Sequence, residues 1–320
     1  MTRYVLKRLL WGLFLIVIVC ALTFVLFRVL PSAEPARLRA GHDASPKVIA
    51  EIRHDLGLNR SLPEQFWLYM KNLFLHGELG YSYYSGASVG NLIANRLPAT
   101  LSLTVGAALI WLLIGIPIGI VSALRRRSRA DRASMGVGLL LISAPEYWLG
   151  LIVLYLFAAD IGQLKIFPGA GAYAGLTADP WKWFSSLVLP WLVLAAGFAA
   201  IYARVMRGSL IEAMGQDWIR TARAKGLSER QVVLKHGLRA AIVPLMTIFA
   251  LDVGVLLGGA VLVETVFDIP GIGRLNYEAI VHADFPIVQG TVLLAAVFII
   301  LANILVDIAH AYVDPRVRYS

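Results

Sequence analysis

The chain has 320 residues, of which 58% are hydrophobic and 15% are charged, and its mean hydropathy is +0.72. A water-soluble globular protein does not have this composition, so most of the chain is expected to lie in a bilayer. The formal charge of +9 would fit nucleic-acid binding, but basic residues in a membrane protein are explained first by topology, and no nucleic-acid partner is expected. Cys20 is the single cysteine, which excludes an intrachain disulfide.

Six apolar runs are long enough to cross a hydrocarbon core, which takes roughly 20 residues of helix. They span residues 9–30, 101–124, 135–157, 187–202, 242–263 and 287–313. The first is longer than an ordinary signal-peptide core and is interpreted as a retained anchor. The fourth is interrupted by Pro190 and Gly197 and is expected to extend on both sides. The predicted fold class is an all-α polytopic membrane protein with six transmembrane helices in one domain, residues 1–320.

Basic residues indicate the orientation of these helices. Lysines and arginines gather in residues 125–132 and 204–239, and positive charge in short loops marks the cytoplasmic side. Both termini are therefore predicted to be cytoplasmic. The segments 31–98 and 264–286 are then external. They form either a lid or docking platform, or simple caps on the helix ends. The spacing of the glycine pairs Gly115/Gly119 and Gly254/Gly258 permits close helix approach, although such patterns are common in membrane helices.

Residues 204–241 form a polar, basic loop between two apolar runs and contain a predicted helix-turn-helix. Gly226 is suited to the left-handed conformation that ends a helix, and Ser228 with Gln231 forms a capping box that begins the next. Leu227 and Val232 occupy the positions of a hydrophobic staple. An apolar stripe is predicted on one helix before the turn, formed by Leu210, Met214, Trp218 and Ala222. The loop either lies on its own membrane domain or docks a soluble partner.

Two acidic residues inside apolar runs are candidate pathway groups. Asp252 falls near the middle of the fifth run, where an ionised side chain is costly and usually faces a cavity. It would contact a substrate amine or cation, or else form a structural hydrogen bond to a neighbouring helix. Glu146, after Pro145 in the third run, raises the same question. The histidines show no metal-ligand spacing, and the sequence lacks a phosphate-binding Gly-rich loop with its lysine, so neither a metal site nor ATP hydrolysis is expected in this chain.

Several ordered motifs together resemble the permease subunits of ABC importers for dipeptides, oligopeptides and nickel. They are Leu56-Gly-Leu-Asn-Arg-Ser-Leu-Pro, Leu97-Pro-Ala-Thr, Pro145-Glu-Tyr-Trp-Leu-Gly, Thr221-Ala-Arg-Ala-Lys-Gly-Leu, Glu264-Thr-Val-Phe with Pro270-Gly-Ile-Gly, Asp284-Phe-Pro with Gln289-Gly, and the Asp314-Pro-Arg-Val-Arg-Tyr end. The resemblance implies a non-catalytic subunit of the bacterial inner membrane. Its implied partners are a homologous second permease, two ATPase subunits that bind ATP and Mg, an extracytoplasmic binding protein, and membrane lipid.

In this family the loop at 204–241 couples the permease to the ATPase. The residues to which that role is carried over are Arg220, Thr221, Ala222, Arg223, Ala224, Lys225, Gly226, Leu227, Ser228 and Gln231. Gly226 would form the turn, Ala222 and Ala224 would allow close packing, and Arg220, Arg223 and Lys225 would supply surface charge. The substrate implied is a peptide, with nickel, glutathione or another small solute as alternatives. An ion-coupled secondary transporter is the alternative of a different class, and it would not need the basic helix-turn-helix.

Overall fold

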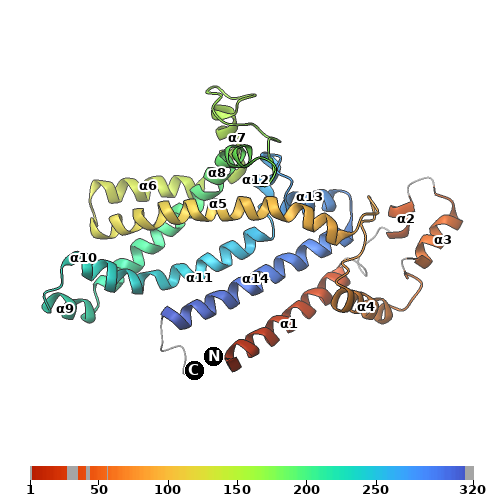
Figure 1. The fold of residues 1–320 in the computed structure, drawn as a ribbon, viewed down its shortest axis with the longest axis horizontal. Coiled ribbons are helices and arrows are strands. Elements are labelled where there is room, and N and C mark those ends of the chain that lie inside the picture. Colours follow the sequence, from red (N-terminus) through yellow and green to blue (C-terminus); the bar gives the residue numbers. More distant parts are fainter. Residues whose placement is uncertain (1, 27–34, 41–43, 56, 314–320) are drawn as a thin grey trace.

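The computed structural model describes residues 2–26, 35–40, 44–55 and 57–313, and these form helices joined by turns and loops (Figure 1). No strand longer than an isolated bridge occurs among them, which confirms the predicted fold class. Leu56 and the motif that begins at Asp314 lie outside the described residues. The elements are α1 (Thr2–Phe24), α2 (Pro35–Ala40), α3 (Pro46–Asp55), α4 (Leu62–Lys71), η2 (Asn72–His76), α5 (Val89–Leu124), α6 (Arg129–Ser143), α7 (Glu146–Phe157), α8 (Pro180–Met214), α9 (Asp217–Ala224), α10 (Glu229–Gln231), η3 (Val232–Gly237), α11 (Leu238–Leu257), α12 (Val261–Val266), α13 (Ile272–Val281) and α14 (Phe285–Val313).

Five helical segments of the described chain are long and apolar enough to cross a membrane. They cover residues 6–24, 89–124, 180–214, 229–257 and 285–306. The sixth candidate span is α6 with α7, and this pair is bent by 102°. The third apolar run is therefore not one straight helix. The break falls at Ala144 because the ring of Pro145 disfavours helical backbone in the residue before it.

The fourth run extends on both sides, as predicted, into the 35-residue helix α8. Pro190 and Gly197 do not interrupt it. A proline in a membrane helix is tolerated where neighbouring groups replace the lost hydrogen bond, and Pro190 is buried in the packed interior. The fifth run does end early, since α11 stops at Leu257 and α12 begins only after Gly258 and Gly259.

The helices α5 and α8 form the central packed pair of the bundle. A Cβ atom on Gly115 would lie 2.7 Å from the backbone oxygen of Ala199, and one on Gly119 would lie 2.6 Å from that of Ala203. The close approach that this glycine spacing permits is therefore present. The other pair acts likewise, since a Cβ on Gly258 would lie 2.6 Å from the Cβ of Ala295 on α14.

The core lies where α5, α8 and α11 meet, around the fully buried Trp111. Figure 1 shows α5, α11, α14 and α1 lying alongside one another, in that order across the picture. At one end of this layer are α9 and α10, and at the opposite end are α2, α3 and α4. The expected helix-turn-helix and the expected external segment are therefore at opposite ends of the bundle.

Candidate coupling segment and membrane site

The turn between α9 and α10 has the geometry expected from its sequence. Gly226 has a φ of 75°, in the left-handed region. Its N–H donates to the carbonyl oxygen of Arg223 at 2.9 Å, and the N–H of Leu227 donates to that of Ala222 at 3.4 Å. These two bonds form a Schellman motif, which ends α9. Ser228 then begins α10 in a capping box with Gln231, whose side chain accepts the N–H of Ser228 at 3.3 Å.

The predicted loop at 204–241 is shorter in the structure, because α8 continues to Met214 and α11 begins at Leu238. We use the name coupling segment for residues 215–237. The predicted apolar stripe on one helix is wrong, since α8 ends and α9 starts between Met214 and Trp218. This break turns α9, so that Trp218 is 42% exposed and Ile219 is buried instead.

A small apolar cluster holds the coupling segment together. Ile219 and Ala222 of α9 pack with Val232 of η3, and Met214 packs against them. A Cβ on Gly237 would lie 2.8 Å from the sulfur of Met214, so the end of α8 and the end of η3 approach closely there. Ala222 therefore packs inward, whereas Ala224 is exposed.

The charged side chains of the coupling segment lie on its outer face. Arg223 donates to both carboxylate oxygens of Glu229, at 2.7 and 3.1 Å, and so joins α9 to α10 across the turn. This carboxylate raises the pKa of the Arg223 guanidinium. Arg220 forms a longer ion pair of 3.3 Å with Asp217. Among the carried-over residues, the exposed ones are Arg220, Thr221, Arg223, Ala224, Lys225, Gly226, Leu227, Ser228 and Gln231.

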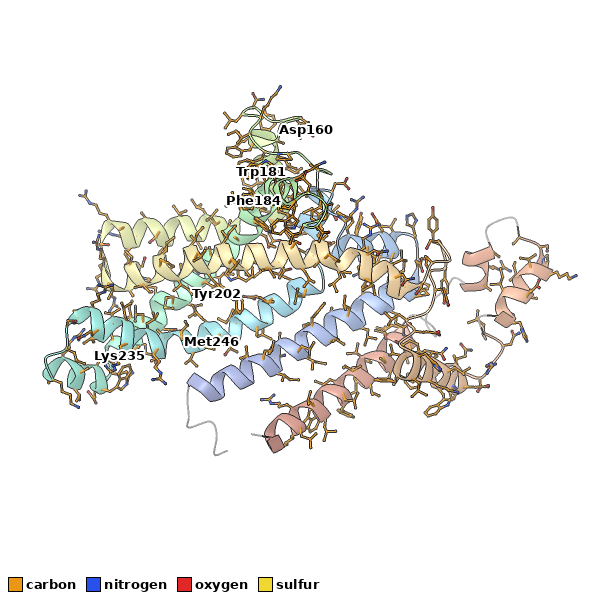
Figure 2. The ribbon with its side chains drawn as sticks, in the orientation of Figure 1. Asp160, Trp181, Phe184, Tyr202, Lys235 and Met246 are labelled. Carbon is orange, nitrogen blue, oxygen red and sulfur yellow. The ribbon has the colours of Figure 1, made fainter. Side chains whose placement is uncertain are left out.

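The second arm of the coupling segment continues without a break into the membrane. The helical residues 229–257, from α10 through η3 to α11, form one span of 29 residues. Figure 2 shows Lys235 near the α9 end of this span and Met246 farther along it. Uninterrupted helix therefore connects the end of the turn at Gly226 to α11.

Asp252 of α11 faces α8 in the interior of the bundle. The hydroxyl of Tyr202 donates to its Oδ2 at 2.8 Å, and Tyr202 is only 1% exposed. Tyr202 in turn packs near Trp111, with ring centroids 5.9 Å apart. The hydrogen bond to a neighbouring helix that the sequence left open is thus present, and Asp252 itself remains partly exposed.

Glu146 occupies the first turn of α7, directly after the bend at Ala144. It is half-buried, and no hydrogen bond between it and Asp252 occurs among the described residues. The two candidate pathway acids therefore lie in separate settings. Asp252 is held by a tyrosine between two long helices, whereas Glu146 lies at the start of a helix, where the positive end of the helix dipole favours an acid.

Two acids at the opposite end of the bundle were not assigned a role from the sequence, although both open recognised motifs. Glu264 is fully buried, and its Oε1 accepts the Thr100 hydroxyl at 2.8 Å and the Ala260 N–H at 3.3 Å. Its Oε2 accepts the Arg274 N–H at 2.9 Å. Thr100 also accepts the N–H of Ile272 at 2.8 Å. The motifs at Leu97, Glu264 and Pro270 thus meet at one carboxylate, and burial raises its pKa.

Asp284 fixes the loop that precedes α5. Its carboxylate accepts the Ser82 hydroxyl, the Tyr83 N–H at 3.0 Å and the Tyr84 N–H at 3.3 Å. Asp284 is 2% exposed and comes just before α14. Part of each predicted external segment is therefore joined to the other through this side chain. The Asp284-Phe-Pro motif was visible in the sequence, but the sequence did not show which groups the aspartate bonds.

The third missed feature is an ion pair near the coupling segment. Arg207 of α8 donates to both carboxylate oxygens of Asp131 on α6, at 2.7 and 2.9 Å. Asp131 also accepts the Arg127 N–H at 2.8 Å. This bidentate pair fastens the start of α6 to the last part of α8.

Known proteins of one kind, the permease subunits of transport systems, match this chain over its whole length. Residues 115–319 match the family "Binding-protein-dependent transport system inner membrane component", and residues 1–104 match the N-terminal family of the same membrane components. The chain is 42% identical over 321 residues to the glutathione transport system permease protein GsiC of Salmonella choleraesuis, and 41% identical to GsiC of Escherichia coli O6:H1. It is 40% identical over 320 residues to a Brucella abortus protein whose name refers to a peptide transport system permease. Each comparison covers 100% of both chains. The chain belongs to the inner-membrane permease family of binding-protein-dependent ABC importers, in the branch for peptides, oligopeptides and nickel.

Proposed function

We propose that this chain is a non-catalytic permease subunit that pairs with a homologous permease to form a pathway for peptides, glutathione included. Two ATPase subunits bind ATP and Mg and dock on the coupling segment, and an extracytoplasmic binding protein delivers the substrate at the opposite end. Both termini are cytoplasmic in this proposal, so that α9 and α10 face the ATPases.

The observation that carries the proposal is the construction of the coupling segment. Its turn is closed by a Schellman motif, by a capping box and by the ion pair between Arg223 and Glu229. Its second arm is continuous with the span 229–257. A rigid hairpin that leads directly into a membrane helix is suited to receive a displacement from a soluble partner and to tilt α11.

The peptide substrate is supported by the relatives, whose names refer to glutathione and peptide transport. Within the membrane we assign Asp252 to the pathway. Its carboxylate is partly exposed and is oriented by the Tyr202 hydroxyl, so it could contact the ammonium group of a passing peptide. Glu146 is the second pathway candidate, at the bend between α6 and α7.

The test is reconstitution in proteoliposomes of this chain with its second permease, both ATPases and the binding protein. We expect uptake of radiolabelled glutathione or a dipeptide only when ATP is present on the side of the membrane where the ATPases are bound. Nickel and an unrelated sugar serve as competing solutes. Uptake by the isolated chain, driven by an ion gradient and without ATP, would instead identify a secondary transporter and overturn the proposal.

A further inference from the structure

A groove of about 260 Å³ lies between the last turns of α5 and the start of α6. Its lining residues are Pro117, Ile118, Val121, Ser122, Ala130 and Ser134. The two serine hydroxyls bond to each other at 2.9 Å, and Ser134 also donates to the carbonyl oxygen of Ala130 at 2.8 Å. Because its hydroxyls are already paired, the groove offers an apolar wall to whatever fills it.

The turn between α5 and α6, next to this groove in the chain, is strongly basic. Five arginines occur within residues 125–132, and all five are exposed. None of their guanidinium groups forms an ion pair or a hydrogen bond with another described residue. The one carboxylate within that stretch, Asp131, is already bonded to Arg207 and to the N–H of Arg127. The arginines are Arg125, Arg126, Arg127, Arg129 and Arg132.

The arginines and the groove follow one another along α5 as the headgroup and the acyl chains follow one another in a phospholipid. Arg125 is the C-cap of α5 and lies about one helical turn, or roughly 6 Å, beyond Val121, and Pro117 lies a further turn into the span. A headgroup phosphate at the arginines would therefore let an acyl chain run along Val121 and Ile118. The groove is open on its α5 side, where Val121 is 48% and Ile118 is 38% exposed.

We propose that this groove binds an anionic phospholipid of the leaflet on the coupling-segment side. The phosphate lies among the arginines of residues 125–132, and one acyl chain lies in the groove. Cytoplasmic leaflets carry anionic lipids, and basic pockets between membrane helices at that side bind their headgroups. The pair Asp131–Arg207 connects this site to α8, just before the coupling segment begins. The bound lipid thereby holds the α5–α6 turn at the membrane surface.

The test uses the purified chain, and then the assembled transporter, in nanodiscs that contain phosphatidylglycerol or phosphatidylcholine spin-labelled on the acyl chain. We expect a motionally restricted fraction that favours phosphatidylglycerol. The triple variant Arg125→Gln, Arg126→Gln, Arg129→Gln should lose that preference by about tenfold or more. A second variant, Ala130→Phe, fills the groove without changing charge and should abolish the restricted fraction.

Two control variants remove the same charge elsewhere. Lys225→Gln, Arg230→Gln, Lys235→Gln acts on the same end of the bundle, and Lys71→Gln, Lys165→Gln, Lys182→Gln acts on the end of α4, the connection between α7 and α8, and the first turn of α8. Both should keep the preference for phosphatidylglycerol. Equal loss in the first control would show general surface attraction, and unchanged binding in Ala130→Phe would show a headgroup contact without a groove. Disappearance of the restricted lipid on assembly would show that a protein subunit occupies the groove. Each of these three results overturns the proposal.

Discussion

The buried carboxylate of Glu264 offers the sharpest test of how α5 is joined to α12 and α13. In Glu264→Ala the Thr100 hydroxyl and the N–H groups of Ala260 and Arg274 lose their acceptor. An unpaired buried donor costs about 1–3 kcal/mol, and the change also removes the cost of burying an acid, so we expect a net loss of about 3–5 kcal/mol. Thr100→Val should weaken the same network, because it leaves the N–H of Ile272 unpaired.

The measurement is thermal unfolding of the purified protein in detergent, followed by tryptophan fluorescence. A loss of this size corresponds to a decrease in Tm on the order of 10 °C. The exposed Glu212→Ala is the matched control and should change Tm little. The double variant of Glu264 and Thr100 should lose less than the sum of the two single changes, by at least about 0.5 kcal/mol. Additive losses, or a Tm for Glu264→Ala equal to that of the control, would refute the network.

The pH dependence of the same network follows from the pKa of Glu264, which burial raises above its ordinary value of 4.5. The folded protein then binds the proton more readily than the unfolded chain does, so this residue contributes more stability at low pH. That contribution is complete below the unfolded pKa and is lost as pH rises through the folded pKa. Glu264→Gln cannot titrate. The difference in Tm between the wild type and Glu264→Gln should therefore shift against the wild type as pH rises from about 4.5.

Three further predictions concern the other sites. Arg223→Glu combined with Gly226→Val removes the ion pair across the turn and forces a β-branched residue to a φ of 75°. ATP hydrolysis should then continue without uptake, while membrane insertion stays normal. Coupled transport by this variant would contradict the role of the turn. Tyr202→Phe should lower stability by about 1–3 kcal/mol, and both Tyr202→Phe and Asp252→Asn should lower uptake. If the effects of the two changes simply add in the double variant, the hydrogen bond between these residues is unimportant. Asp284→Asn should release the loop at residues 80–88, which chymotrypsin would then cleave faster at Tyr81, Tyr83 and Tyr84, and the exposed Asp160→Asn should leave cleavage unchanged.

Local features of this chain were determined by the sequence alone. The capping box at Ser228 and the left-handed Gly226 depend on contacts within a few residues, so their chemistry specifies them directly. The glycine pair at Gly115 and Gly119 permitted close approach, because a missing side chain leaves space on one helical face. The apolar runs likewise indicated the membrane spans, because hydrophobic burial over a fixed bilayer thickness requires a minimum length.

Only the tertiary structure decided which distant groups meet. Glu264 and Thr100 are 164 residues apart, and Asp284 and Ser82 are 202 apart, so no local pattern could pair them. The same holds for Asp131 with Arg207, and for the choice of Ile219 over Trp218 as the buried residue of α9. Hydrophobic burial is non-directional, so the composition of the sequence is enough to predict it. A buried carboxylate instead needs hydrogen-bond donors at defined positions, and those positions exist only after the helices have packed.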